Sequence, residues 1–295
     1  MSFGGEISER YMRNFMRNAP AWATIVKEVE RRVKSRPPTK LALLDVASGP
    51  GEPAGGLKQR FPEARVVASD VEASMIEKQK AYLRETDVES TIADANSLPF
   101  DAEEFDAVTM CFGIMYCDLE KAPKEIFRVL KPKGGVFVGT YWRKHEVTRL
   151  ARDLFDEFGE TALKDLMIQP EVENPNVILN SFAQAHFSEV EIKDGSYAQK
   201  CGDDFDDFFT QVSLPFKIAL DKATDKSDEE KASLLARAKE AIRNSDKFKD
   251  VDDGGYSVKH NEFSMVIAIK HNSHVNVDDD DDDPDDDGVK KNQSP

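Results

Sequence analysis

The feature that most constrains this chain is the stretch at residues 41–56, which reads LALLDVASGPGEPAGG. Its first six positions hold five apolar residues, a run typical of a strand covered on both faces. Gly49 and Gly51 follow at once, and glycine permits positive φ and close approach of a ligand to the backbone. A helix that starts after this loop would offer free N–H groups and the positive end of its dipole. The stretch therefore predicts a buried strand, a tight loop and a helix, with an anionic or polar ligand at the loop.

The glycine loop alone leaves the class of ligand open. Gly49-x-Gly51-x-x-Ala54 fits the dinucleotide fingerprint G-x-G-x-x-G/A. Asp45, however, lies inside the end of the predicted strand, where a dinucleotide site usually carries an apolar residue. A carboxylate at that point can bind the ammonium group of an amino acid, so the rest of the chain has to decide between the two ligands.

A second acid stands where a nucleoside ligand would need it. Residues 64–70 form the next predicted strand, which ends in Asp70, 25 residues after Asp45. That offset is typical of an acid that a βαβ unit brings to a ribose, and a carboxylate can accept hydrogen bonds from both vicinal hydroxyls. Met75, in the first turn of the following helix, would pack either against an adenine or in the core.

Strand and helix patterns alternate along the chain beyond the loop. Further strands are predicted at 90–95, 105–112 and 136–141, and helices at 73–84 and 118–130. This alternation predicts a parallel, doubly wound α/β sheet. Two more helices, at 146–158 and 175–185, precede a final pair of strands at 190–192 and 263–269.

About 70 residues separate the two final strands, too many for a hairpin and too apolar for a disordered loop. Within this interval, residues 200–250 carry enough phenylalanine and aliphatic side chains for a core of their own. Ser227-x-x-Glu230 is a capping box that starts a helix there. We therefore predict a helical cap over the C-terminal edge of the sheet, where α/β sheets bind ligands.

The N-terminal region, residues 6–35, carries apolar side chains at three- and four-residue spacing, which predicts two helices with a break at 18–20. These helices would either pack on the domain edge or act as a lid, with Tyr11 or Trp22 facing a ligand. The expected organisation is an N-terminal helical lid at 1–39, a core at 40–199 and 260–271, a helical cap insert at 200–259 and a disordered acidic tail at 272–295.

Charge and cysteine usage limit the class of protein further. The net charge is −16, of which residues 278–295, with nine Asp and two Lys, contribute −7; the remaining −9 argues against general nucleic-acid affinity. The three cysteines fit neither a disulfide framework nor a metal site. The N-terminus lacks a secretory pattern, and no apolar run approaches the roughly 18 residues of a membrane span. We expect a cytoplasmic protein without bound metal, nucleic acid or stable membrane insertion; a protein partner is not predictable.

Four motifs, in order, resemble the class I S-adenosylmethionine-dependent methyltransferases. The first motif is Asp45-x-Ala47-x-Gly49-x-Gly51, and the second is Asp70. The third is Asp94-Ala95 with Leu98-Pro99-Phe100. The fourth is a group made of Phe105-Asp106, Phe112-Gly113-Ile114 and the run at 128–135. In the last group the chain is similar to the ubiquinone/menaquinone biosynthesis methyltransferases. The resemblance covers roughly residues 40–142 and implies a Rossmann-like sheet of seven strands, the last antiparallel, with S-adenosyl-L-methionine as cofactor.

The resemblance also implies a role for each matching residue. Asp45 would contact the methionine ammonium, and Asp70 would hold both ribose hydroxyls. Asp94 would accept from the adenine amino group, and the Ala95 N–H would donate to a ring nitrogen. The remaining predicted cofactor-binding residues are Ala47, Ser48, Gly49 and Gly51 around methionine and ribose, Val71 and Met75 beside Asp70, and Cys111 and Phe112 at the sulfonium. The chain departs from the family at Ala47, which stands where the first motif glycine is expected, and at Ser48.

The reaction implied is an in-line displacement of the sulfonium methyl by a small-molecule acceptor, in which positioning and desolvation carry most of the rate. A neutral thioether or amine acceptor needs no base, whereas a base such as His145 could help with a hydroxyl or an activated carbon. Tyr141 is a second catalytic candidate. The candidates for the substrate wall are Tyr11, Trp22, Tyr116, Tyr141 and Trp142.

Three other functions remain open at this point. The motif subgroup suggests methylation of a quinone ring carbon, although no membrane-facing hydrophobic or basic helix is evident. A non-catalytic binding protein could use the acidic tail for a partner, but the intact Asp45, Asp70 and Asp94 argue against decay of a cofactor site. An NAD(P) dehydrogenase is the weakest alternative, because no catalytic Tyr-x-x-x-Lys supports it.

Overall fold

The computed structural model describes residues 16–167, 172, 174–202, 204–245, 248–250 and 255–271. Tyr11, the first part of the predicted lid and the predicted acidic tail at 272–295 lie outside these residues. Among the residues described, no helix combines the length and the apolar character needed to cross a bilayer.

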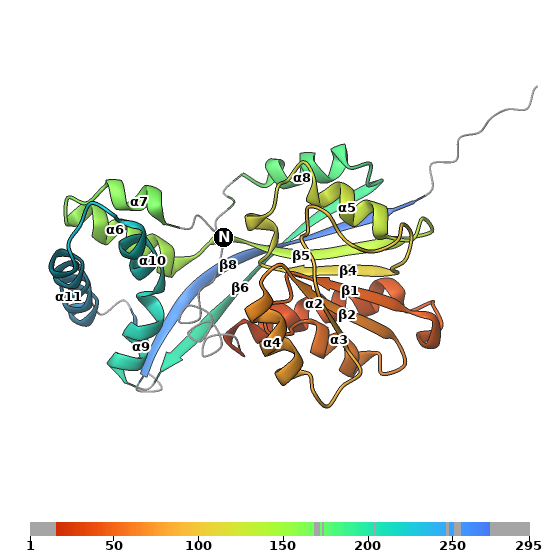
Figure 1. The fold of residues 1–295 in the computed structure, drawn as a ribbon, viewed down its shortest axis with the longest axis horizontal. Coiled ribbons are helices and arrows are strands. Elements are labelled where there is room, and N and C mark those ends of the chain that lie inside the picture. Colours follow the sequence, from red (N-terminus) through yellow and green to blue (C-terminus); the bar gives the residue numbers. More distant parts are fainter. Residues whose placement is uncertain are drawn as a thin grey trace, which may run out of the picture.

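One mixed sheet organises the molecule, with strand order β3-β2-β1-β4-β5-β8-β6 and a short β7 paired to β8 (Figure 1). The strands are β1 Ala42–Val46, β2 Arg65–Asp70, β3 Glu89–Ile92, β4 Ala107–Cys111, β5 Gly135–Lys144, β6 Glu189–Gly202, β7 Lys249–Asp250 and β8 Gly255–Lys270. Neighbours among β1 to β5 pair in parallel, and β8 is antiparallel to both β5 and β6. The predicted doubly wound sheet, with seven main strands and an antiparallel last strand, is confirmed.

Helices cover both faces of this sheet. They are α2 Ala19–Val33, α3 Ala54–Arg60, α4 Ala73–Tyr82, α5 Ala122–Val129, α6 Glu146–Glu157, α7 Ala162–Leu166, α8 Pro175–Gln184, α9 Phe205–Val212, α10 Leu214–Lys222 and α11 Asp228–Asn244, with 3-10 turns η1 Met16–Asn18, η2 Pro38–Lys40 and η3 Ile114–Tyr116. Side chains of α2 and α3 pack in one apolar cluster with β1, while α5 and α8 pack in another on the opposite face.

Several predicted boundaries differ from the structure for physical reasons. Helix α5 starts at Ala122, four residues later than expected, so that Pro123 stands in the first turn, where its missing N–H removes no helical hydrogen bond. The third strand ends at Ile92, and Asp94 lies in a turn bridged to Ser97. The two final strands are far longer than the predicted three and seven residues, with 14 residues in β6 and 16 in β8.

Strands β6 and β8 are longer than their neighbours. Together they extend beyond the C-terminal ends of β1, β4 and β5 as a two-stranded ribbon (Figure 1). A second group of helices, α6, α7, α9, α10 and α11, surrounds the far end of this ribbon. Their shared core includes Phe155 stacked on Phe216, with ring centroids 4.0 Å apart. We call these five helices and their core the helical cluster. The predicted capping box at Ser227 and Glu230 is confirmed, with both hydrogen bonds formed at the start of α11.

Candidate functional site

Asp45, near the end of strand β1, places a carboxylate at the base of the glycine loop. Asp45 is fully buried, and its two oxygens accept hydrogen bonds from Thr109 Oγ1 (2.7 Å) and the Ala54 backbone N–H (3.1 Å). Burial raises the pKa of Asp45 to about 7, although these hydrogen bonds oppose the shift. The carboxylate is therefore poised to ionise fully when a cation approaches, as the prediction of an ammonium ligand requires.

The glycine loop turns through left-handed backbone conformations. Gly49 has φ of 53°, Gly51 has φ of 124°, and Ala47, at the position where the resemblance expects glycine, has φ of 53°. A side chain at Gly51 would also meet Leu83, because a Cβ there would lie 2.9 Å from Leu83 Cδ1. Alanine tolerates the conformation at 47 at a cost of about 1 kcal/mol, so this departure from the motif keeps the loop shape.

Strand β2 ends in Asp70, which is tied to the loop. Asp70 Oδ2 accepts from the Gly49 N–H (2.9 Å) and Oδ1 from the Glu72 N–H (3.0 Å). Burial raises the pKa of Asp70. Gln79, which the sequence analysis missed, is fully buried and donates to the Gly49 carbonyl at 3.0 Å. Asp70, the acid predicted to bind a ribose, and Gln79 of α4 thus both hold the backbone of Gly49.

Asp94 lies close to Asp70 across the same edge of the sheet. Its Oδ1 accepts from the Asn96 N–H at 2.9 Å, which fixes the turn after β3. Cys117 lies near both acids: burial raises the pKa of its thiol to about 12, and the charges of Asp94 and Asp70 add to the shift. The Asp118 N–H, just after η3, donates to Asn96 Oδ1 at 3.0 Å, so the end of η3 lies beside the turn that carries Asp94.

Exposed apolar side chains flank these acids. Val71 is 57% exposed and Tyr116 49% exposed, which is high for side chains of this kind. Met75 and Ala95 are buried beside them. A flat ligand ring at this edge would cover Val71 and Tyr116; the cofactor contact predicted for Val71 stays a prediction.

Cys111, at the end of β4, has hydrogen bonds with Trp22 of α2 and Thr140 of β5. Burial raises the pKa of its thiol, hydrogen bonds from Thr140 and Trp22 oppose the shift, and the nearby carboxylates of Asp45 and Glu52 add to it. Trp22 is 6% exposed and comes from α2, a helix that precedes the sheet in the chain. The structure thus brings the predicted lid residue Trp22 to the predicted sulfonium position at Cys111.

Five rings form one group beside Cys111, which we call the aromatic cluster: Phe112, Trp142, His145, Tyr197 and Phe263. Phe112, with φ of 54°, stacks on Trp142 at a centroid distance of 3.8 Å and 4° between ring planes. Tyr197 and Phe263 were not among the predicted site residues, because Tyr197 lies outside any predicted strand and Phe263 has the pattern of an ordinary strand residue.

His145 lies at the edge of the aromatic cluster, directly before α6. Its ring centroid is 4.9 Å from that of Trp142, and its Nδ1 is 2.7 Å from Thr148 Oγ1. Burial lowers its pKa to about 4, so the imidazole is neutral at physiological pH and binds a proton only weakly. The role of His145 as a base stays a prediction.

Tyr141 is not brought to this group. Side chains of adjacent strand residues point to opposite faces, and Tyr141 is fully buried in the apolar cluster of α5 and α8, while its neighbour Trp142 faces Phe112. A ligand would reach Tyr141 only if that core opened. Its predicted catalytic and substrate roles therefore gain no support from its position.

Glu52 is a further acid in the loop that was not predicted as a site residue, although an acid inside a glycine loop is itself a signal. Its Oε2 accepts from the Gly56 N–H and its Oε1 from the Tyr82 hydroxyl, both at 2.9 Å. Burial raises its pKa. Two buried carboxylates, Asp45 and Asp70, and the half-buried Glu52 thus surround one loop. Such a site suits a ligand with positive charge and hydroxyl donors, as the amino acid and sulfonium parts of S-adenosylmethionine would be.

Comparisons with known proteins show which proteins this chain is similar to. Residues 43–134 match the family described as "Methyltransferase domain". The demethylmenaquinone methyltransferase of Thermus thermophilus is 44% identical over 99 residues, which is 32% of this chain and 45% of that protein. The mitochondrial 2-methoxy-6-polyprenyl-1,4-benzoquinol methylase of Caenorhabditis elegans is 31% identical over 129 residues, 41% of this chain and 44% of that protein. The matched segment spans less than half of each relative.

Two solved structures share the fold. The YcgJ protein of Bacillus subtilis has a TM-score of 0.54 at 18% identity, and the match covers 86% of this chain and 99% of that one. The [4+2]-cyclase SpnF has a TM-score of 0.50 at 18% identity and covers 84% of this chain and 80% of that one. The second name shows that this fold also carries chemistry other than methyl transfer, so the activity has to be argued from the site.

Proposed function

We propose that this chain, which carries a methyltransferase domain of the class I, S-adenosylmethionine-dependent type, transfers a methyl group from that cofactor to a small-molecule acceptor. One observation carries the proposal: Asp45, Asp70 and Asp94 converge at the C-terminal ends of β1, β2 and β3 around a glycine loop. The polar groups that an adenosyl amino acid presents are an ammonium, a ribose diol and an adenine amino group. Each is a donor, and each finds a carboxylate.

The residues would hold the cofactor in the order of the strands. Asp45 would bind the ammonium, Asp70 the two ribose hydroxyls, and Asp94 with the Ala95 N–H the adenine edge. Val71 and Met75 would contact the adenine face, and Cys111 would border the sulfonium. Bound in this way, the cofactor supplies an electrophilic methyl group. Ala47, Ser48, Gly49 and Gly51 would contribute backbone contacts.

The acceptor would approach from the aromatic cluster, next to Cys111. Trp22 and Trp142 are almost fully buried and would exclude water from the reacting atoms, which favours a displacement that disperses charge. His145, with its ring 4.9 Å from Trp142, would be the residue to take a proton from a hydroxyl or activated-carbon acceptor, and its pKa would have to rise from about 4 when the acceptor binds. A thioether or amine acceptor would leave His145 without a chemical role.

A second candidate is methylation of a quinol ring carbon. The names of the two curated relatives favour it, since both act on quinone-type rings by name. The aromatic cluster agrees with a flat apolar acceptor, because its rings supply apolar surface next to Cys111.

The surrounding regions have proposed roles as well. We propose the helix α2 region as the lid, the helical cluster as a cap beyond the acceptor side, and the acidic tail as a solubilising or partner-binding segment. The proposed compartment is the cytoplasm, on the grounds of the reduced-thiol cysteine usage.

The test is a titration followed by a panel of acceptors. Isothermal titration of the full chain with S-adenosylmethionine, S-adenosylhomocysteine, adenosine and NADH should give binding of the first two and much weaker binding of adenosine, which lacks the ammonium. Transfer of labelled methyl to thioether, amine, hydroxyl or quinol acceptors would then name the acceptor atom, and His145→Gln should slow only acceptors that lose a proton. Binding of NADH with no binding of either adenosyl amino acid would contradict the proposal.

A further inference from the structure

Helix α4 supports the glycine loop at two points that lie one helical turn apart. Leu83 lies against Gly51, where an added Cβ would come within 2.9 Å of Leu83 Cδ1. Gln79 donates from Nε2 to the Gly49 carbonyl at 3.0 Å. Residues four apart in a helix share a face, so one face of α4 meets both glycines, with an apolar contact from Leu83 and a polar one from Gln79.

Gln79 is a polar exception on this apolar face. The other buried residues of α4 are Met75 and Ile76, and Leu83 at its C-cap is buried as well. Gln79 is fully buried, and its Oε1 has no hydrogen-bond partner among the described residues. A buried carbonyl that has lost its water destabilises the fold. Stability alone would therefore favour an apolar side chain at position 79, which points to a role for the amide in the site.

The backbone of Gly49 is held on both sides. Gln79 binds its carbonyl, and Asp70 Oδ2 accepts from its N–H at 2.9 Å. Gly49 has φ of 53°, and because glycine has no Cβ, it can leave this conformation without steric hindrance. Hydrogen bonds rather than steric restriction therefore keep Gly49 in place, and the loss of the one from Gln79 would free it to rotate.

Asp70 in turn depends on Gly49 for its orientation. Its Oδ1 accepts from the N–H of Glu72, the N-cap of α4, at 3.0 Å, and its Oδ2 accepts from Gly49. A carboxylate can accept about four hydrogen bonds, so each oxygen keeps the capacity for one more. The two bound N–H groups fix the plane in which the remaining lone pairs lie. Helix α4 thus orients Asp70 directly through Glu72 and indirectly through Gln79 and Gly49.

We propose that Gln79 is a positioning residue, which holds Gly49 so that Asp70 is oriented for a vicinal diol, and that it thereby sets the preference of the site for ligands with both ribose hydroxyls. Rotation of Gly49 would take its N–H away from Oδ2 and leave the carboxylate held at Oδ1 alone. Two hydroxyls on adjacent carbons need both oxygens in one plane, whereas a single hydroxyl can follow a rotated carboxylate. The ligand part of this inference rests on the proposed function; the hold on Gly49 does not.

The decisive variant is Gln79→Met, which keeps the length of the side chain and removes both amide groups. Its affinity for S-adenosylhomocysteine, measured by calorimetric titration, should fall roughly threefold to tenfold, the range of one hydrogen bond. Its affinity for the 2′-deoxy analogue of the same ligand should stay as in wild type, because that analogue has no diol. The melting temperature should stay or rise, since the variant buries no unpaired carbonyl.

Two further variants separate positioning from packing. In an Asp70→Asn background, Gln79→Met should cost little further affinity, because residues that act as one unit are not additive. Lys80→Met, which places a methionine at the exposed neighbouring position of α4, should change none of these readouts. A lower melting temperature in Gln79→Met, with equal losses of affinity for S-adenosylhomocysteine and its 2′-deoxy analogue, would show a role in packing alone and overturn the inference.

A readout without ligand keeps this inference apart from the proposed function. Hydrogen exchange of the Gly49 amide, followed by NMR, should be faster in Gln79→Met than in wild type, because the N–H then leaves Asp70 more often. If wild type binds no adenosyl ligand, the proposed function fails, and this exchange rate still decides whether Gln79 holds Gly49. If exchange and both affinities in Gln79→Met equal those of wild type, the inference is overturned even where the cofactor binds.

Discussion

The parallel strands β1 to β4 and the ribbon with its helical cluster are built on opposite principles. The parallel half buries polar groups at its C-terminal edge: Asp45 and Gln79 are fully covered, and Asp70 nearly so. The core of the helical cluster is apolar, with aromatic rings such as Phe155 and Phe216 stacked on each other, and its charges lie at the surface. Buried carboxylates destabilise a fold unless a ligand or hydrogen bonds compensate for them, so the first half is shaped by binding and the second by packing.

The largest effect that would test this contrast is in the helical cluster. Phe216→Ala should lower the free energy of unfolding by about 4 kcal/mol, because it removes a buried ring and leaves a cavity beside Phe155. Chemical denaturation measures the loss. Asp221→Ala, on the exposed side of the same helix, should change stability by less than about 0.5 kcal/mol. A parallel loss of S-adenosylhomocysteine affinity in Phe216→Ala would show that the two regions are not separable.

Asp70→Ala should affect ligand affinity more than the free energy of unfolding, the reverse of Phe216→Ala. It removes the proposed acceptor for two ribose hydroxyls, and hydrogen bonds to a charged group contribute enough that affinity for S-adenosylhomocysteine should fall about 100-fold, or roughly 3 kcal/mol. Calorimetric titration measures the affinity. Asp70→Asn keeps the size of the side chain and one acceptor and should fall in between. Wild-type affinity in Asp70→Ala would remove the ribose assignment.

Gly51 in the glycine loop and Gly159 in the helical cluster, both with positive φ, allow the same substitution to be compared in the two regions. Gly51→Ala should destabilise the chain by about 2 kcal/mol and weaken cofactor binding, since φ of 124° strains any side chain and the Cβ meets Leu83. Gly159→Ala, after α6, should cost only about 1 kcal/mol, because its φ of 76° is the sole penalty: nothing lies within 4 Å of the added Cβ. Thermal melts and titrations of both variants compare them. If both variants weakened cofactor binding equally, the contrast between a region shaped by binding and a region shaped by packing would be wrong.

The smallest predicted effect is a pH dependence confined to the parallel half. Because the pKa of Asp45 is about 7 and an ammonium ligand needs the carboxylate ionised, affinity for S-adenosylhomocysteine should rise about tenfold from pH 5.5 to pH 7. In the unliganded protein the same group makes stability fall as the pH rises from about 4 to about 7, since the native state keeps a proton that the unfolded chain releases. Asp45→Asn should flatten both curves.

The same contrast explains what could be predicted from the sequence. The strand–loop–helix at 41–56 and the acid at Asp70 were readable because left-handed turns and strand-end acids restrict residue types locally. The length of β6 was not readable, since its distal residues alternate without strong apolar character and are ordered by pairing with β8. Glu52 and Gln79 were missed because their burial arises only on folding.

One prediction was open to correction from the sequence itself. Tyr141 and Trp142 were both assigned to the substrate wall, yet neighbours in a strand face opposite sides of the sheet. The structure places Tyr141 in the core and Trp142 in the aromatic cluster. Which of the two faces the site depends on the register of β5 with β8, and that pairing joins segments more than 100 residues apart.

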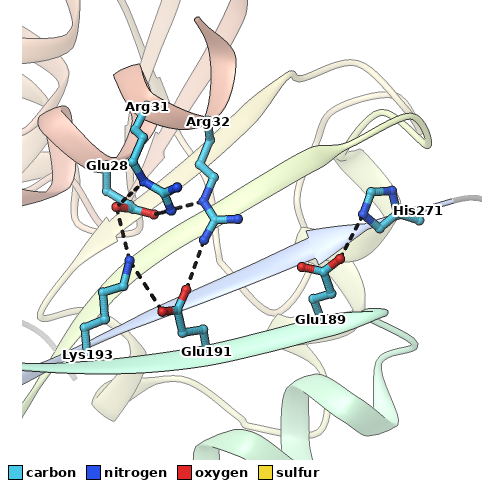
Figure 2. A network of polar contacts seen from close by, with 7 residues as sticks. All are labelled: Glu28, Arg31, Arg32, Glu189, Glu191, Lys193 and His271. Carbon is cyan, nitrogen blue, oxygen red and sulfur yellow. Dashed lines mark hydrogen bonds and ion pairs between the residues drawn. The ribbon is translucent and has the colours of Figure 1, made fainter.

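Strand β6 has a further consequence, for association between copies of the chain. Among the described strands it pairs with β8 alone, so its outer edge presents backbone N–H and C=O groups that another strand could bind. Glu189, Glu191 and Lys193 follow one another at every second position along that edge, and charged side chains on an edge strand disfavour pairing with a second copy. Glu191 and Lys193, which pair with α2 (Figure 2), thus also keep this edge, the longest open one among the described strands, from acting as a template for aggregation.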